Sequence, residues 1–129
     1  MRLLRLSILL SFPALTSYGA TFGTVTTALG AADIVLDQPR GRLYLINSNL
    51  NRVQVYSIAQ RTFLASVTTG TQPLAGAMSP DGRFLYVTCY AQASLNVIDL
   101  ARSTVTRRVS LPANPEGVAV GFDGKARPF

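Results

Sequence analysis

The sequence of 129 residues contains no histidine and a single cysteine, Cys89. The absence of histidine removes the commonest general base and the commonest metal ligand. One cysteine cannot form an internal disulfide, and no CxxC or CxxCH motif is present to bind a metal or attach haem. We therefore expect Cys89 to be a buried, inert thiol, and we predict no catalytic residue, no metal site and no cofactor.

Charged residues are few, at 14 %, whereas 48 % of the residues are hydrophobic. This balance argues against a disordered chain and allows a packed core. The net charge is +6, but the basic residues are scattered singly except for Arg107 and Arg108, and no aromatic residues alternate with a basic run. We therefore expect no nucleic-acid partner.

The beginning of the chain has the three parts of a secretory signal. Two arginines precede a short apolar stretch, and the small residues Ser17 and Gly19 lie three and one positions before a cleavage point at Ala20. The apolar stretch is too short to span a bilayer comfortably, and we expect no transmembrane segment after cleavage. The sequence predicts a signal peptide over residues 1–19 and an exported chain, periplasmic or extracellular if the organism is bacterial. The alternative is a buried N-terminal strand or helix.

The remainder of the chain repeats at a spacing of 42 residues. Leu43-Tyr44 aligns with Leu85-Tyr86, and Asp81-Gly82 aligns with Asp123-Gly124. Further matches at this spacing join Val25 with Val67 and Val109, Val55 with Val97, Pro73 with Pro115, and Ala77 with Ala119. A recurrence at one fixed spacing is the sequence signature of a repeat protein.

Each repeat contains four short apolar runs that are separated by turn residues and are rich in β-branched and aromatic residues. The predicted strands of the two complete repeats cover residues 33–37, 42–47, 53–58 and 62–68, then 75–79, 84–89, 95–100 and 104–110. An outer strand over 22–28 precedes them, and an inner strand over 117–121 follows. Four antiparallel strands in about 42 residues is the size of one β-propeller blade. We therefore predict an all-β, β-propeller-like stack of four-stranded antiparallel blades over residues 20–129.

Three segments of the repeat resemble the YVTN family of β-propeller repeats, which occurs in exported bacterial and archaeal proteins. They read SPDGRFLYVT, LNVIDLA and NPEGVAV, and the resemblance covers residues 21–125. It implies a propeller fold, while related propellers serve as binding modules, surface antigens, lactonase-like enzymes or electron-transfer subunits. The first repeat departs from the pattern, because Asp37-Gln38-Pro39-Arg40-Gly41 replaces S-P-D-G. We expect its first turn to have a different shape.

The predicted ring is open. A closed propeller needs about four or more blades, and the chain supplies two blades, over 33–68 and 75–110, together with the leading outer strand and the start of a next blade over 117–125. That amounts to about two and a half blades, and residues 126–129 do not continue the pattern. Three interpretations stay open: a truncated copy of a longer propeller, a ring assembled from several chains, and a small open sheet. Exposed blade faces also predict self-association.

The candidate binding site lies on the loops of the rim that carries the crossovers between blades. We expect its polar members to be exposed: Asn49, Arg52, Tyr90, Gln92, Asn114 and Glu116. They suit a polar ligand, a peptide or a glycan, although ordinary turn chemistry also explains polar residues in turns. Asp33 and Glu116 could together hold a Ca²⁺ ion, but their spacing is not specific for one.

These observations predict a non-catalytic, exported binding or scaffold protein, a β-propeller fragment whose partner is a ligand, protein or glycan. The alternative is part of a lactonase-like hydrolase whose catalytic residues lie in missing blades. That alternative needs histidines or clustered carboxylates on the rim, and the chain contains no histidine.

Overall fold

A computed structural model of the chain describes residues 30–129. The predicted signal peptide and the predicted outer strand over 22–28 lie outside the described residues. Within residues 30–129 every regular element is a β-strand and every strand pair is antiparallel, which confirms the all-β fold class. This part of the chain accordingly contains no helix that could cross a membrane.

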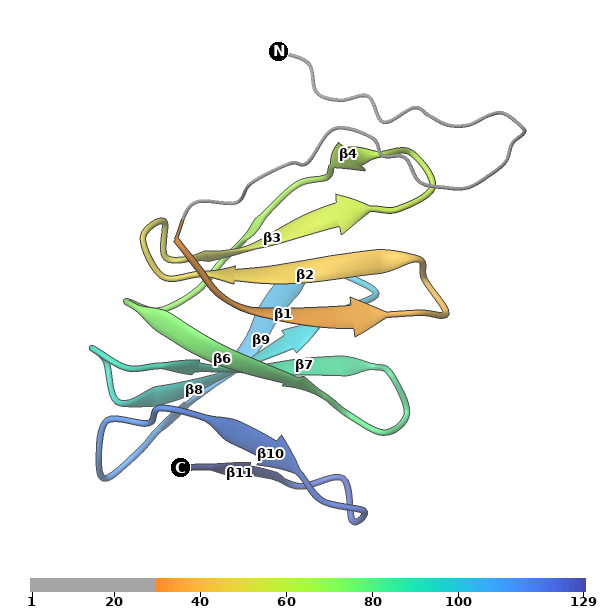
Figure 1. Cartoon of the computed structure of the whole chain (residues 1–129). Helices are drawn as coiled ribbons and strands as arrows, with labels where there is room; N and C mark the ends of the chain where they lie inside the picture. The colour runs from red at the N-terminus through yellow and green to blue at the C-terminus, as the bar shows by residue number, and fades with distance from the viewer. Residues whose placement is uncertain (1–29) are drawn as a thin grey trace, which may run out of the picture.

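The strands form three sheets that stack on one another and do not close into a ring (Figure 1). The first blade contains β1 (Ala31–Asp37), β2 (Arg42–Asn47), β3 (Arg52–Ser57), β4 (Thr62–Phe63) and β5 (Val67–Thr68). The second blade contains β6 (Pro73–Met78), β7 (Phe84–Cys89), β8 (Ser94–Asp99) and β9 (Thr104–Ser110). A terminal hairpin follows, formed by β10 (Val118–Val120) and β11 (Ala126–Pro128). The inner and second strands of each complete blade lie within two residues of the predicted bounds.

Backbone conformation repeats at the spacing found in the sequence. Among residues 30–129, all residues with positive φ except Gly41 form pairs 42 positions apart: Gly30 and Gln72, Asn51 and Ala93, Arg61 and Ser103, and Gly82 and Gly124. The register shift in β1–β2 lies between Ala31 and Asp33, and that in β6–β7 lies between Pro73 and Ala75. The two blades therefore share their irregularities as well as their strands.

The first turn differs between the blades, as the sequence predicts. In the second blade Gly82 N–H donates to Ser79 O at 2.9 Å, whereas in the first blade Gly41 N–H donates to Gln38 O at 3.1 Å. The positive φ accordingly falls on Gly41 and not on Arg40, the residue 42 positions before Gly82. The turn of the first blade lies one residue later in the chain.

The single outer strand predicted over 62–68 is wrong, because the first blade has two short strands there. β4 and β5 both pair with β3, and Leu64 N–H donates to Val55 O between them. In the second blade β9 stays a single strand, although its pairing with β8 shifts register between Val97 and Ile98. At this shift Thr106 Oγ1 donates to Val97 O at 3.3 Å. The first blade has Leu64 in place of that threonine and Ala65, a poor strand former, next to it.

Residues 126–129 leave the repeat pattern in sequence, as expected, but part of this segment nevertheless forms a strand. Residues 126–128 form β11, at the position of the second strand of a third blade. The register of this pair differs by one residue from that of β6–β7. In β6–β7, Gly76 pairs with Val87, so the same register 42 positions later would pair Val118 with Phe129. In β10–β11, Val118 pairs with Pro128 instead. A slip of one residue reverses which side chains face each side of a strand.

The hydrophobic core lies between the two complete blades. Tyr44, Ile46, Val53, Val55 and Val67 of the first blade form one buried cluster with Leu85, Val87, Cys89, Ile98 and Leu100 of the second. The predicted buried state of Cys89 is confirmed, because its side chain is 0 % exposed. Burial also raises the pKa of its thiol, which keeps it protonated and unreactive.

Candidate functional site

The six predicted site residues lie in or beside the loops on the crossover rim, on the left in Figure 1. Hydrogen bonds connect neighbouring loops there. Gln72 N–H donates to Asn51 Oδ1 at 2.8 Å, Tyr90 N–H donates to Gln72 O at 2.9 Å, and Asn114 Nδ2 donates to Tyr90 O at 2.6 Å. The crossovers are therefore joined to the hairpin loops from the first blade to the terminal hairpin, and Tyr90 and Asn114 are brought together.

The other predicted members do not join this pair. Asn49 lies over Gly30 and Gln92 lies over Gly70, where each side chain leaves no room for a Cβ on the glycine. Arg52 Nε donates to Leu50 O at 3.4 Å within its own blade. Glu116 is exposed, and its backbone N–H donates to Phe129 O. The rim is thus an open polar surface, and its role in binding stays a prediction.

The carboxylates hold the fold together at several separate places. Asp33 Oδ2 accepts Gly76 N–H from the neighbouring blade at 3.0 Å, and its Oδ1 accepts Ile34 N–H at 2.8 Å. Asp33 is therefore committed to the blade interface and is not available beside Glu116. Among residues 30–129 no group of three histidine, cysteine or acidic side chains could hold a metal ion.

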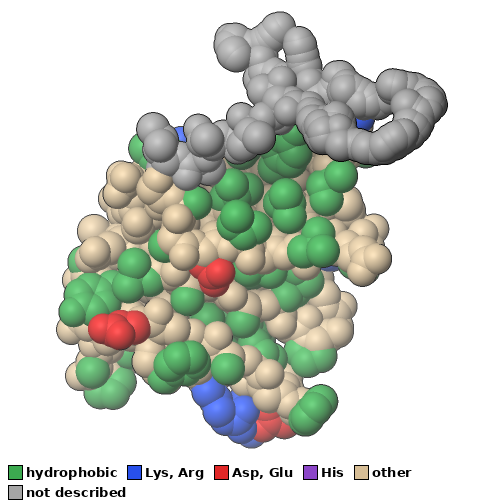
Figure 2. Space-filling view, viewed as in Figure 1, with side chains coloured by type: hydrophobic (Ala, Val, Ile, Leu, Met, Phe, Trp, Pro, Cys, Tyr) green, Lys and Arg blue, Asp and Glu red, His purple; other side chains and the backbone are tan. Residues whose placement is uncertain are grey.

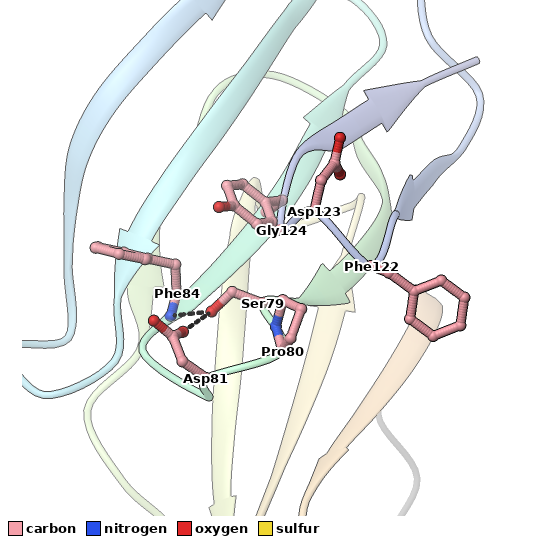
Figure 3. A pocket seen from close by; sticks show the side chains of 8 residues that line it. Ser79, Pro80, Asp81, Phe84, Phe122, Asp123 and Gly124 are labelled. Atoms are coloured by element: carbon pink, nitrogen blue, oxygen red, sulfur yellow. Dashed lines mark hydrogen bonds between the residues drawn. The ribbon is translucent and has the colours of Figure 1, made fainter.

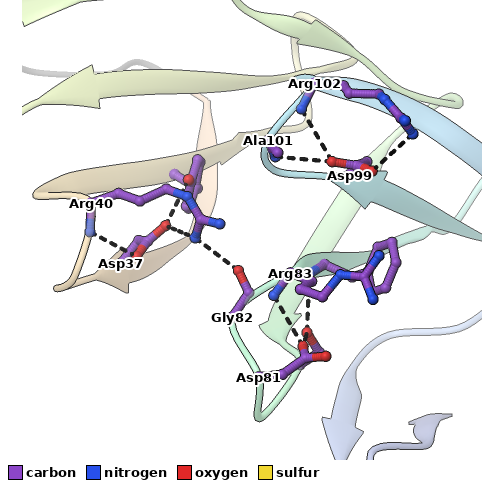
Figure 4. Close-up of polar contacts among 11 residues, drawn as sticks. Asp37, Arg40, Asp81, Gly82, Arg83, Asp99, Ala101 and Arg102 are labelled. Atoms are coloured by element: carbon purple, nitrogen blue, oxygen red, sulfur yellow. Dashed lines mark hydrogen bonds and ion pairs between the residues drawn. The ribbon is translucent and has the colours of Figure 1, made fainter.

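Asp37 is the most buried acid, with 1 % of its surface exposed. Its Oδ2 accepts hydrogen bonds from Tyr44 Oη and from Arg40 Nη1, both at 2.9 Å, and Arg40 Nη1 also donates to Gly82 O in the second blade (Figure 4). Burial raises the pKa of Asp37, but the hydrogen bonds from Arg40 and Tyr44 outweigh burial and leave the pKa below its ordinary value. Burial, followed by Asp37, raises the pKa of Tyr44 to about 12.

Two exposed aspartates stabilise equivalent turns of the opposite rim. Asp81 Oδ1 accepts Ser79 Oγ–H at 2.6 Å and Arg83 N–H at 3.0 Å, and the Ser79 hydrogen bond lowers the pKa of Asp81. Asp123 is paired with Arg127 at 2.9 Å, which lowers the pKa of Asp123. Asp99 caps the β8–β9 turn in the same manner (Figure 4). These contacts give each carboxylate a structural partner.

Two adjoining grooves lie away from the predicted rim site, between the second blade and the terminal hairpin. The smaller groove, of about 280 Å³, separates the Ser79–Asp81 turn from the Phe122–Gly124 turn (Figure 3). The larger groove, of about 540 Å³, lies over the face of β7, β8 and β9. Phe84, Tyr86 and Gly124 line both grooves. None of the six predicted residues lines either one, so the sequence prediction missed these grooves.

The sequence does contain a signal for the larger groove, which is the 42-residue repeat of apolar strand residues and not the polar residues of the rim loops. Alternate residues of a strand face opposite sides of the sheet, and Tyr86, Leu95 and Val97 lie 42 positions after Tyr44, Val53 and Val55. The earlier three are buried between the blades. The later three line the larger groove, so this groove corresponds in the second blade to the interior surface of the first.

Comparisons with known proteins support the fold. No family model and no curated protein matches the sequence. Among solved structures, hydrazine synthase of Kuenenia stuttgartiensis is similar at 26 % identity and a TM-score of 0.72, over 85 % of this chain and 32 % of that one. A protein of unknown function from Desulfotomaculum acetoxidans matches at 20 % identity and a TM-score of 0.72, over 84 % of this chain and 37 % of its own.

A β-propeller domain from Myceliophteria thermophila, Cps50 (Swd1), is similar at 14 % identity and a TM-score of 0.62, over 70 % of this chain and 29 % of that domain. The chain therefore has a β-propeller fold and spans about a third of the length of the structures that it matches. These similarities support a partial propeller.

Proposed function

We propose that the chain is an exported, non-catalytic binding or scaffold unit built from YVTN-type propeller repeats. The propeller fold and the repeated turn sequences support the repeat type. The positively charged, then apolar, then small-residue pattern of residues 1–19 supports export. The partner is a polar ligand, a glycan or a protein that contacts the loops of the crossover rim.

The observation that carries the non-catalytic role is the use of the carboxylates. Of the six acidic residues in the chain, five accept hydrogen bonds that hold turns or blades together: Asp33, Asp37, Asp81, Asp99 and Asp123. A general acid or base must be free to exchange a proton with a substrate. Carboxylates that hold the backbone in this way are suited to a scaffold.

The rim proposal is tested by titrating ¹⁵N-labelled protein with soluble cell-wall glycan fragments and recording amide spectra. We expect shifts confined to the rim, and we expect their loss in a Tyr90→Ala, Asn114→Ala variant. Shifts that persist in this variant, or that appear only on the opposite rim, would contradict the site. Phe122→Ala, on the opposite rim, is the matched control.

Export is tested separately by fusing residues 1–29 to a reporter that is active only outside the cytoplasm. We expect reporter activity and a processed product that begins at Ala20. A retained reporter would support the alternative of a buried N-terminal segment.

A second candidate is a propeller section of a larger enzyme. The match to a chain named hydrazine synthase, over about a third of that chain, favours it. The lactonase-like alternative belongs to the same class, because its reacting groups would also lie outside this chain. Turnover of a lactone by the 129-residue protein that is lost on changing a single rim residue would replace the non-catalytic proposal.

A further inference from the structure

The larger groove has an apolar floor contributed by three strands. Phe84 and Tyr86 of β7, Leu95 and Val97 of β8, and Val109 of β9 line it. Its volume of about 540 Å³ lies within the range of natural ligand sites. The floor is a sheet face with alternate side chains directed into the groove, which is the surface that an extended chain can cover.

The equivalent face of the first blade shows which kind of structure packs on such an apolar sheet face. Tyr44, Val53, Val55 and Val67 lie 42 positions before Tyr86, Leu95, Val97 and Val109. These four are buried in one cluster with residues of β7 and β8, including Leu85, Val87 and Ile98. A set of side chains that differs only by valine in place of leucine is thus covered by β-strands inside the molecule, and a strand is the occupant that fits the groove.

One wall of the groove is the edge of β11. Gly117 and Phe129 exchange backbone hydrogen bonds, and Gly121 N–H donates to Lys125 O. Because backbone groups alternate along a strand, Ala126 directs its N–H and C=O away from β10, and Pro128 directs its C=O there. Ala126 also lines the groove. An added strand would therefore find main-chain partners beside the apolar floor.

The groove carries two cations, Arg107 on β9 and Lys125 in the hairpin. Within residues 30–129 neither side chain forms an ion pair, and the neighbouring Asp123 is already paired with Arg127. At the position of Arg107 the first blade has Ala65. The groove face of the second blade therefore carries a positive charge that the corresponding face of the first blade lacks, and this charge favours a partner with negative charges.

We propose that this groove binds an acidic, extended peptide segment of a partner protein as an added β-strand along β11. Alternate apolar side chains of the segment cover Tyr86, Leu95 and Val97, and its carboxylates reach Arg107 and Lys125. The proposal rests on the proposed binding function but locates it on a different surface from the rim.

The test measures the binding of a fluorescent peptide of about eight residues, with alternating valine and aspartate, to the full chain by anisotropy. The matched peptide replaces aspartate by lysine. We expect the acidic peptide to bind at least about ten-fold more tightly, and Arg107→Glu and Lys125→Glu each to weaken it by about ten-fold. The control is Arg61→Glu, the same charge reversal at an exposed turn of the first blade.

Two further measurements separate a strand from other occupants. Methylating one alternate set of peptide amides should abolish binding, whereas methylating the other set should preserve it, because only one edge of a strand pairs with β11. Equal binding of both methylated peptides, equal binding of the lysine peptide, or tighter binding of decanoate would overturn the proposal. Self-association of the chain that Arg107→Glu abolishes would assign the groove to a second copy instead. Rim titrations are independent of these outcomes, because no rim residue lines the groove.

Discussion

At the scale of single residues, the two blades stabilise corresponding turns with different side chains. The first blade uses a buried carboxylate, Asp37, with Arg40 and Tyr44. The second has Ser79 at the position of Asp37, and Ser79 Oγ donates to Asp81. Arg40 also contacts Gly82 O at 2.8 Å across the blade boundary. One polar cluster therefore orders a turn and links two blades.

Replacing Tyr44 by phenylalanine tests this cluster. The variant removes the hydroxyl that donates to the Asp37 carboxylate, and we expect the free energy of unfolding to fall by about 1.5 kcal/mol, since the acceptor is charged. Urea denaturation measures the difference. The control is Tyr86→Phe at the corresponding position, which should change stability by less than about 0.5 kcal/mol. Equal losses in both variants would contradict a specific role for the Tyr44 hydroxyl.

The lowered pKa of Asp37 predicts a pH dependence of stability. A carboxyl group whose pKa is lower in the folded state stabilises the protein above its ordinary pKa of 3.8, and this contribution is lost as the pH falls through the lowered value. We expect wild type to exceed Asp37→Asn in stability at neutral pH, with a difference that shrinks below the ordinary pKa. Denaturation from pH 7 to pH 2.5 measures it, with Glu116→Gln as the exposed control. A difference that is constant with pH would contradict the assignment.

Ala93 is a second test at this scale, because its φ is +45°. An alanine in the left-handed region carries a steric cost that asparagine tolerates better, and its counterpart in the first blade is Asn51 with φ +53°. We expect Ala93→Asn to raise the free energy of unfolding by about 0.5–1 kcal/mol. The reverse change, Asn51→Ala, should lower it, since Asn51 Oδ1 also accepts Gln72 N–H. Thermal denaturation of both variants checks the pair.

At the scale of elements, the contact between blades depends on a close approach at β6. A Cβ built on Gly76 would meet Ile46 Cδ1 at 3.0 Å and Val35 Cγ2 at 3.3 Å. Gly76 also donates its N–H to Asp33 of the facing blade. Glycine at this position lets the inner strand of the second blade lie against the sheet of the first.

Gly76→Val should therefore overpack this contact and destabilise the protein by about 1–3 kcal/mol. Ile46→Val removes the Cδ1 atom and alone should cost about 0.5–1.5 kcal/mol. We expect the double variant to be more stable than the sum of the two losses predicts, because the second change relieves the clash made by the first. Strict additivity of the unfolding free energies would contradict direct contact.

At the scale of the whole molecule, the stack that residues 30–129 form has one outer blade face at each end that no other described strand covers. On the first blade Ile34 and Leu36 are each 57 % exposed and Phe63 is 38 % exposed, and hydrophobic side chains reach the surface across the view in Figure 2. The corresponding positions of the second blade, Gly76, Met78 and Val105, face the first blade and are half-buried. The open face thus has the composition of a surface that is covered inside the molecule.

This composition supports the self-association that the sequence predicts, through the first-blade face. We expect the sedimentation coefficient to rise with protein concentration, and we expect Ile34→Lys with Leu36→Lys to suppress the rise while leaving the strand signal in circular dichroism unchanged. Gln38→Lys with Gln60→Lys, at exposed turn positions of the same blade, is the charge-matched control. Suppression by the control pair to the same extent would show that net charge, and not the apolar face, governs association.

The sequence by itself determined the repeat, its spacing, the first three strands of each complete blade and the turns. These features are local, because alternation of apolar residues and the φ preferences of glycine, asparagine and proline act over a few neighbouring residues. The departure of the first turn at Asp37-Gln38-Pro39-Arg40-Gly41 was predicted for the same reason. The polar character of the rim also follows from its turns, although the sequence does not indicate which of its members meet.

Only the tertiary structure decided which blade face is covered, how Arg40 reaches Gly82 of the second blade, and where the grooves lie. These depend on contacts between residues about 42 positions apart, which no local preference encodes. The register of β11 was decided there too, since β10 offers an edge that residues 126–128 can join despite their departure from the repeat. Hydrogen bonding and burial between sheets therefore decided the packing of the blades and the register of β11, which strand propensity alone does not determine.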